Sequence, residues 1–165
     1  MELVELCKAI EENDVAGVQK LLQTDNKTIY LNQSETKQCP LHLACKLGSL
    51  DIVRLLMGDE RVDVNKQNEK GETPFFVACL FERVEVVKLM MENEKVDVDC
   101  MDHSKITPFY DACQKGILEL IKLLSQDKRV DACMGEFPCL SVLLISTLSL
   151  FIKHLTICRE FVWQE

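Results

Sequence analysis

The sequence is short of the residues and motifs that catalytic sites use. Its 165 residues include only three histidines, and it lacks a Gly-rich phosphate loop, a G-x-S-x-G elbow and an H-E-x-x-H helix. It also lacks any run of lysine and arginine, and its net charge is -8. An acidic chain repels phosphate backbones. These absences argue against an enzyme and against nucleic acid as a partner, and no cofactor is expected.

The sequence also lacks the features of a secreted protein. Its nine cysteines are an odd number, so at least one thiol is unpaired, whereas disulfide frameworks are usually even. The N-terminus starts with Met1-Glu2-Leu3-Val4-Glu5, which is acidic and unlike a signal peptide. We therefore expect a reducing, cytoplasmic location.

The sequence repeats itself with a step of 34 residues. Three of its four prolines stand at Pro40, Pro74 and Pro108. The same step relates Ala44, Ala78 and Ala112; Cys45, Cys79 and Cys113; Leu50, Val84 and Leu118; and the Val-Asp pairs that begin at Val62, Val96 and Val130. A fixed period of this length predicts a repeat architecture.

Each copy begins with the signals of a short helix. Proline fixes φ and needs no amide partner, so it suits the first turn of a helix. Thr73 and Thr107 precede two of these prolines and supply a hydroxyl for the helix cap. Gly48 and Gly116 are expected to end the helix, because glycine adopts a left-handed conformation cheaply.

The second half of each copy predicts another helix and a turn. Residues 50–56 carry an apolar stripe with Asp51 and Arg54 between its members, which is typical of a half-buried helix. Residues 62–64 alternate as Val-Asp-Val and predict an extended segment. Residues 68–71 read Asn-Glu-Lys-Gly and predict a turn before the next helix.

These features resemble the ankyrin repeat, whose signature includes a T-P-L-H-x-A stretch. The matching stretches are Cys39-Pro40-Leu41-His42-Leu43-Ala44, Thr73-Pro74-Phe75-Phe76-Val77-Ala78 and Thr107-Pro108-Phe109-Tyr110-Asp111-Ala112. The resemblance implies an all-α solenoid of stacked helix-turn-helix units joined by short β-hairpin loops. The tetratricopeptide repeat has a similar period but fits worse, because it has no Thr-Pro start and no Val-Asp-Val segment.

The repeat divides the chain into an array over residues 1–134 and a separate end. The array comprises an N-terminal capping repeat at 1–32 and repeats at 33–67, 68–101 and 102–134. Residues 135–165 are predicted to be a degenerate or divergent hydrophobic segment. Within it, residues 137–152 carry no charge, but a membrane span needs about 20 apolar residues. A final cap on repeat 3 is favoured over a membrane contact through 137–152, and an altered C-terminus stays open.

The repeats depart from the ankyrin pattern in several places. The period is 34 instead of the common 33, with the extra residue in the loop after the second helix. Glu82 stands where the other copies have a glycine between the helices, and Lys105 stands where repeat 2 has its hairpin glycine, Gly71. Each replacement is expected to cost about 0.5–1 kcal/mol if the backbone still needs a positive φ.

Two pairs of cysteine and histidine have a spacing that metal ligands use. Cys39-x-x-His42 and Cys100-x-x-His103 each resemble half of a zinc site. They belong to different repeats and should lie far apart, so no metal site is expected. The cysteines that recur in phase with the repeat are expected to be small packing residues.

The resemblance implies a protein-protein interaction module that binds another protein, whose identity the sequence does not reveal. The alternative is a regulatory or targeting fragment of a larger protein, catalytic or membrane-anchored. Family contacts come from the hairpin tips and the end of the first helix. Carried over by position, the hairpin-tip residues are Glu35, Thr36, Gln38, Glu69, Lys70, Glu72, His103, Ser104 and Ile106, and the helix residues are Lys46, Leu47, Leu80, Phe81, Gln114 and Lys115. Leu47, Leu80, Phe81 and Ile106 are expected to form an exposed apolar patch, which marks interaction sites.

Overall fold

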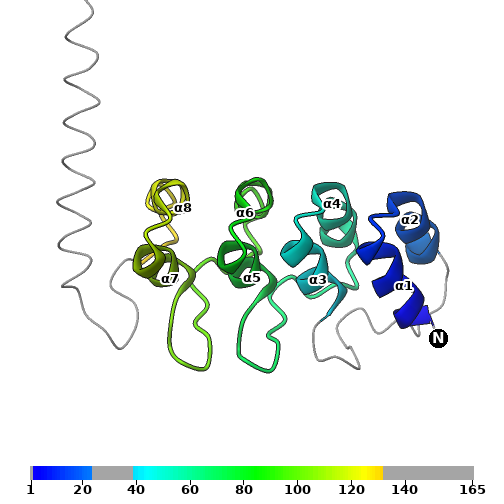
Figure 1. Cartoon of the computed structure of the whole chain (residues 1–165), viewed down its shortest axis with the longest axis horizontal. Helices are drawn as coiled ribbons and strands as arrows, with labels where there is room; N and C mark the ends of the chain where they lie inside the picture. The colour runs from blue at the N-terminus through cyan, green and yellow to red at the C-terminus, as the bar shows by residue number, and fades with distance from the viewer. Residues whose placement is uncertain (1, 24–38, 132–165) are drawn as a thin grey trace, which may run out of the picture.

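The computed structural model describes residues 2–23 and 39–131, and within these ranges all regular structure is helical. The described helices are α1 (Glu2–Glu11), α2 (Val15–Gln23), α3 (Pro40–Leu47), α4 (Leu50–Gly58), α5 (Pro74–Leu80), α6 (Val84–Met91), α7 (Pro108–Lys115) and α8 (Leu118–Leu124). Figure 1 shows them as two stacked rows, an inner row of α1, α3, α5 and α7 and an outer row of α2, α4, α6 and α8. Each successive pair packs on the one before it, so the predicted all-α stack is confirmed.

The inner helices start as their sequence predicts. Pro40, Pro74 and Pro108 each occupy the first turn. The hydroxyl of Thr73 accepts a hydrogen bond from the backbone N–H of Phe76 at 3.2 Å, and Thr107 does the same in α7. These bonds satisfy amides that have no partner within the helix.

Small side chains let neighbouring inner helices approach one another. Ala44, Ala78 and Ala112 are buried at the centres of α3, α5 and α7. Larger apolar residues from both rows close the core around them, among them Leu41, Ile52, Leu56, Phe75, Val86, Met90, Phe109, Leu120 and Leu124. The core is therefore a continuous layer between the two rows, in which each repeat buries its apolar stripe against the next.

A left-handed residue joins the two helices of every repeat. The position is occupied by Asn13, Gly48, Glu82 and Gly116, whose φ angles are 55°, 82°, 58° and 71°. The backbone thus keeps a positive φ at Glu82 although the glycine is missing. Lys105 likewise has a φ of 60° where Gly71 has 80°. The condition for the expected cost in stability is thus met at both positions, because the backbone of both residues lies in a region that L-residues disfavour.

The loops between repeats project beyond the inner row, as Figure 1 shows. Their tips are narrow turns: Asn68 N–H donates to the carbonyl of Glu72 at 3.0 Å, and Asp102 N–H donates to that of Ile106 at 3.0 Å. The extended segment expected at residues 62–64 is not a strand. Val62 N–H instead donates to the carbonyl of Asp59 at 3.0 Å, so the chain turns immediately after α4.

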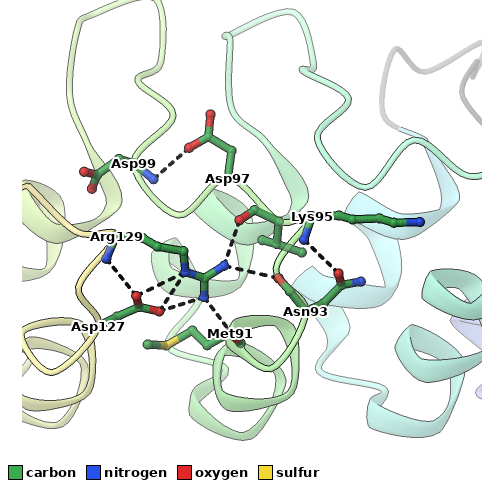
Figure 2. Close-up of polar contacts among 8 residues, drawn as sticks. Met91, Asn93, Lys95, Asp97, Asp99, Asp127 and Arg129 are labelled. Carbon is green, nitrogen blue, oxygen red and sulfur yellow. Dashed lines mark hydrogen bonds and ion pairs between the residues drawn. The ribbon is translucent and has the colours of Figure 1, made fainter.

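The loop that contains the extra residue of the 34-residue period holds an arginine clamp. Figure 2 shows the guanidinium of Arg129, after α8, reaching back to the end of α6. It donates to the carbonyl of Met91 at 2.7 Å and to the carbonyls of Asn93 and Val96 at 3.2 Å, and Asp127 holds it from the other side. The carbonyls at a helix end lack partners within the helix. Arg129 of repeat 3 therefore supplies hydrogen-bond donors to the carbonyls at and after the C-terminal end of α6 in repeat 2.

The arginine clamp recurs between the capping repeat and repeat 1, which is the first junction. It is missing between repeats 1 and 2, which is the middle junction. Arg61, paired with Asp59, donates to the carbonyl of Leu22 in α2 at 2.7 Å. Lys95 stands at the corresponding position after α6, and its side chain is exposed. Within residues 2–23 and 39–131, the Lys95 ammonium makes no hydrogen bond to α4. An open groove of about 500 Å³ lies there, lined in part by Met57, Leu89 and Lys95.

A second link between repeats shows the opposite pattern: it is complete between repeats 1 and 2, where the clamp is missing, and incomplete between repeats 2 and 3. The Asn65 side chain donates to the carbonyl of Lys95 at 2.7 Å and accepts from the N–H of Asp97 at 2.8 Å. Asp99, one repeat later, accepts from the N–H of Asp131 but has no donor of its own. Its Oδ1 atom is buried without a hydrogen-bond partner in the described part of the chain. The Asp99 side chain therefore makes one hydrogen bond between repeats 2 and 3, whereas the Asn65 side chain makes two between repeats 1 and 2.

Candidate protein-binding face

The exposed side of the inner row is built from the last turn of each inner helix. Lys46 and Leu47 end α3, Leu80 and Phe81 end α5, and Gln114 and Lys115 end α7. Leu47, Phe81, Gln114 and Lys115 are exposed, and Lys46 and Leu80 are half-buried. The loop tips project beyond the inner row (Figure 1). We call this surface, helix ends and loop tips together, the inner face.

Two large apolar side chains are exposed on the inner face. Leu47 is 41% exposed and Phe81 is 40% exposed, and they belong to the packed helices α3 and α5. Leu80 and Ile106, which the sequence also placed in the apolar patch, are half-buried. Val4 in α1 and Leu118 in α8 are the other large apolar side chains exposed in the described ranges. Leu47 and Phe81 are the two that lie on neighbouring inner helices, at the junction between repeats 1 and 2.

Local backbone geometry holds Phe81 at the surface. Its N–H donates to the carbonyl of Val77 at 3.1 Å, so the residue closes the last turn of α5. The left-handed residue Glu82 then turns the chain toward α6. The ring is thus exposed at a hydrogen-bonded helix end, so this protein would lose little backbone entropy when a partner binds there.

Two cationic side chains lie at this junction, and one of them contacts the Phe81 ring. The Lys46 ammonium lies over it, 5.3 Å from the ring centroid, which is within the range of a cation–π interaction. Arg83 donates from Nε to the carbonyl of Lys46 at 2.9 Å. Arg83 was not among the residues expected from the sequence. In the sequence, Arg83 stands out only because the corresponding residues of repeats 1 and 3 are Ser49 and Ile117.

The loop tips carry most of the remaining predicted contacts. Glu69 and Lys70 are exposed at one tip, and His103 and Ser104 at the next. The two tips touch: His103 N–H donates to the carbonyl of Lys70 at 2.8 Å. Glu35, Thr36 and Gln38 lie outside the residues that the structure describes.

Glu72 does not lie where the sequence placed it. It is 8% exposed, and its carboxylate accepts from the Asn68 side chain at 2.7 Å. Its carbonyl lies 2.9 Å from Nε2 of His42 in the preceding repeat. Glu72 therefore belongs to the packing between repeats, and its expected contact with a partner is corrected here.

The end of α7 is exposed and partly neutralised. Gln114 and Lys115 both face solvent, as expected for contact residues. The Lys115 ammonium pairs with Asp111 at 2.8 Å, and Asp111 is itself buried. Repeat 3 thus offers a polar surface of little net charge, in contrast to the apolar and cationic junction between repeats 1 and 2.

The pair Cys39 and His42 is a structural contact. Cys39 Sγ lies 2.9 Å from Nδ1 of His42. Because Nε2 must donate to the Glu72 carbonyl, Nδ1 is the acceptor, and the thiol donates to it. Burial raises the pKa of Cys39 and lowers that of His42, so both groups stay neutral. A thiol held protonated is a poor nucleophile and metal ligand.

The cysteines that repeat in phase are packing residues. Cys45 and Cys79 are buried, and Cys45 contacts the sulfur of Met90 at 3.6 Å. Burial raises the pKa of both, and it raises the pKa of Cys113 to about 11. Within the described ranges, His, Cys, Asp and Glu side chains form no group of three that suits a metal ion. None of the helices described there is long and apolar enough to cross a membrane.

Comparison with protein families agrees with this geometry. A family model for ankyrin repeats, described as three copies, matches residues 6–102 and 41–136. The chain therefore belongs to the ankyrin-repeat family. No curated protein matches it. Ankyrin repeats are generally protein-protein interaction modules and typically carry no catalytic activity.

Proposed function

We propose that this protein binds a protein partner through its inner face, with the junction between repeats 1 and 2 as the centre of the contact. The observation that carries the proposal is the exposure of Leu47 and Phe81 side by side on packed helices. Single exposed apolar residues are common on protein surfaces. Here the repeat pattern requires no apolar side chain at either position, and the two residues occupy corresponding positions on neighbouring helices.

The surroundings of Phe81 support its role as an anchor. Large aromatic residues near the centre of an interface often contribute most of its binding energy, about 2 kcal/mol or more on truncation. Phe81 is fixed on a helix end, and the half-buried Leu80 extends the apolar surface beside it. Gln114, Lys115 and the tips at Glu69–Lys70 and His103–Ser104 would form the polar rim around this centre.

The proposal concerns binding and assigns no catalytic step. The six cysteines in the described ranges are free thiols, which fits the reducing, intracellular setting expected from the sequence. The partner's identity calls for an unbiased experiment.

Comparative affinity capture tests the proposal. The full chain, its Phe81→Ala variant and its Glu92→Ala variant would each be used as bait in extract from the source cells, with quantitative mass spectrometry of what they retain. Glu92 is exposed at the end of α6 in the outer row, so its loss should leave the inner face intact. We expect specific partners to be retained by wild type and Glu92→Ala and depleted from Phe81→Ala. Equal retention by all three would contradict the proposed face.

A further inference from the structure

One cation lies over the exposed aromatic ring at the junction between repeats 1 and 2, and a second crosses the same junction. The Lys46 side chain crosses from repeat 1 to lie over Phe81 of repeat 2, at 5.3 Å. Arg83 crosses in the opposite direction and donates to the Lys46 carbonyl at 2.9 Å. We call Lys46, Leu47, Phe81 and Arg83 the junction patch.

No carboxylate of the described ranges neutralises the two cations. Lys46 and Arg83 form no ion pair within residues 2–23 and 39–131, whereas Lys115 on the next inner helix is paired with Asp111. Glu82 is the nearest carboxylate in sequence and makes no ion pair with either of them. The junction patch is thus a locally cationic and apolar spot on a chain whose net charge is -8.

We propose that the junction patch selects an acidic segment of the partner, with an apolar side chain on Leu47 and Phe81 and a carboxylate beside Lys46 and Arg83. The inference rests on the proposed function and names the chemistry of its partner. Complementary charge fixes the register of a contact and disfavours partners of the wrong sign. On an acidic protein, a cationic spot beside the apolar anchor would favour a carboxylate at that point of the contact.

Three labelled peptides of one length test the proposal on the full chain. They share a central Leu-Trp pair and are flanked on each side by two glutamates, two glutamines or two lysines. Fluorescence anisotropy gives the dissociation constant of each. We expect the glutamate peptide to bind about tenfold more tightly than the glutamine peptide, and the lysine peptide to bind most weakly. Added salt should weaken the glutamate peptide most, because surface charge pairs are screened.

A matched pair of double variants assigns any preference to the patch. Lys46→Glu with Arg83→Glu should reverse the order of the glutamate and lysine peptides. Lys66→Glu with Lys122→Glu changes the net charge by the same amount, at exposed residues outside the patch, and should preserve the order. Thermal unfolding of both double variants would confirm that they are folded.

The outcomes separate this inference from the proposed function. If Phe81→Ala weakens all three peptides but their order is independent of charge, the binding face stands and the acidic partner is wrong. If Phe81→Ala leaves every affinity unchanged, or if no peptide binds at about 1 mM, both are wrong. If both double variants reverse the order alike, overall charge and not the junction patch decides the preference, which overturns the inference.

Discussion

Replacing Asp99 with asparagine should make the protein more stable at neutral pH. Asn65 occupies the corresponding position one repeat earlier, and it both donates to the Lys95 carbonyl and accepts from the Asp97 N–H. Asp99 makes only the second kind of bond, and its buried Oδ1 is without a partner in the described ranges. An amide at this position should reach the carbonyl of Arg129, which corresponds to that of Lys95.

The size of the effect follows from one added bond and one removed charge. A net hydrogen bond contributes about 0.5–1.5 kcal/mol, and an unsatisfied buried polar atom costs about 1–3 kcal/mol. Asp99 is partly accessible, so we expect the lower end, about 1–2 kcal/mol in the free energy of unfolding at pH 7. For a chain of this size that is an increase in Tm of about 3–6 °C.

The pH dependence provides a second readout with a defined sign. Burial, aided by the carboxylates of Asp131, Asp97 and Asp127, raises the pKa of Asp99 in the native state. The native state therefore holds this proton more tightly than the unfolded state, and stability is lost as pH rises through the native pKa. The advantage of Asp99→Asn should consequently be large at pH 7 and shrink near pH 3.

Urea unfolding followed by circular dichroism at the two pH values measures both effects on the full chain. Asn65→Asp is the matched reverse change, and it should destabilise the protein because the bond to the Lys95 carbonyl is lost. An Asp99→Asn protein that is less stable than wild type at pH 7, or a gain that is independent of pH, would refute the reasoning.

Three further predictions follow from differences among the repeats. Glu82→Gly should raise the free energy of unfolding by about 0.5–1 kcal/mol in urea titrations. Gly116→Ala should lower it by a similar amount, because open space surrounds the site and only the positive φ opposes a side chain. Opposite signs would show that the φ values are wrong. Lys95→Arg should stabilise by about 1 kcal/mol in the same assay by completing the clamp at the middle junction, and an unchanged midpoint would mean that the arginine does not reach α4. Burial lowers the pKa of His42, so the free energy of unfolding should fall as pH drops below about 6.5 toward the native pKa. His42→Phe introduces the residue that repeat 2 has at Phe76, and it should flatten that part of the pH profile. An identical slope in both proteins would exclude His42 as its source.

Much of the fold could be predicted because repetition turns a local signal into a global one. The Pro and Ala positions recur every 34 residues, so helix starts and packing surfaces were assigned together. The positive φ at Glu82 was also predictable, since the neighbouring copies have glycine there. The contact of Arg129 with the end of α6 was not predictable, because a hydrogen bond from a guanidinium to backbone carbonyls does not affect the pattern of hydrophobic residues.

The candidate face was predictable only by position. Exposure at Leu47 and Phe81 follows from their place in the repeat, whereas the burial of Glu72 depends on contacts with Asn68 and with His42 of the preceding repeat. Arg83 was missed because it lies outside the positions that carry contacts in the family, and only the packing of two repeats brings it to Lys46. Spacing along one copy cannot reveal side chains that meet across two.

The affinity for a captured partner tests the central claim most directly. Isothermal titration of wild type, Phe81→Ala and Glu92→Ala against the same purified partner gives three dissociation constants, and thermal unfolding of each protein checks its fold. The account predicts that Phe81→Ala binds at least about tenfold more weakly, corresponding to about 1.4 kcal/mol, with an unchanged Tm, and that Glu92→Ala binds like wild type. An unchanged affinity for Phe81→Ala, a loss in Glu92→Ala alone, or a Phe81→Ala protein that unfolds would contradict the assignment of the inner face as the binding surface.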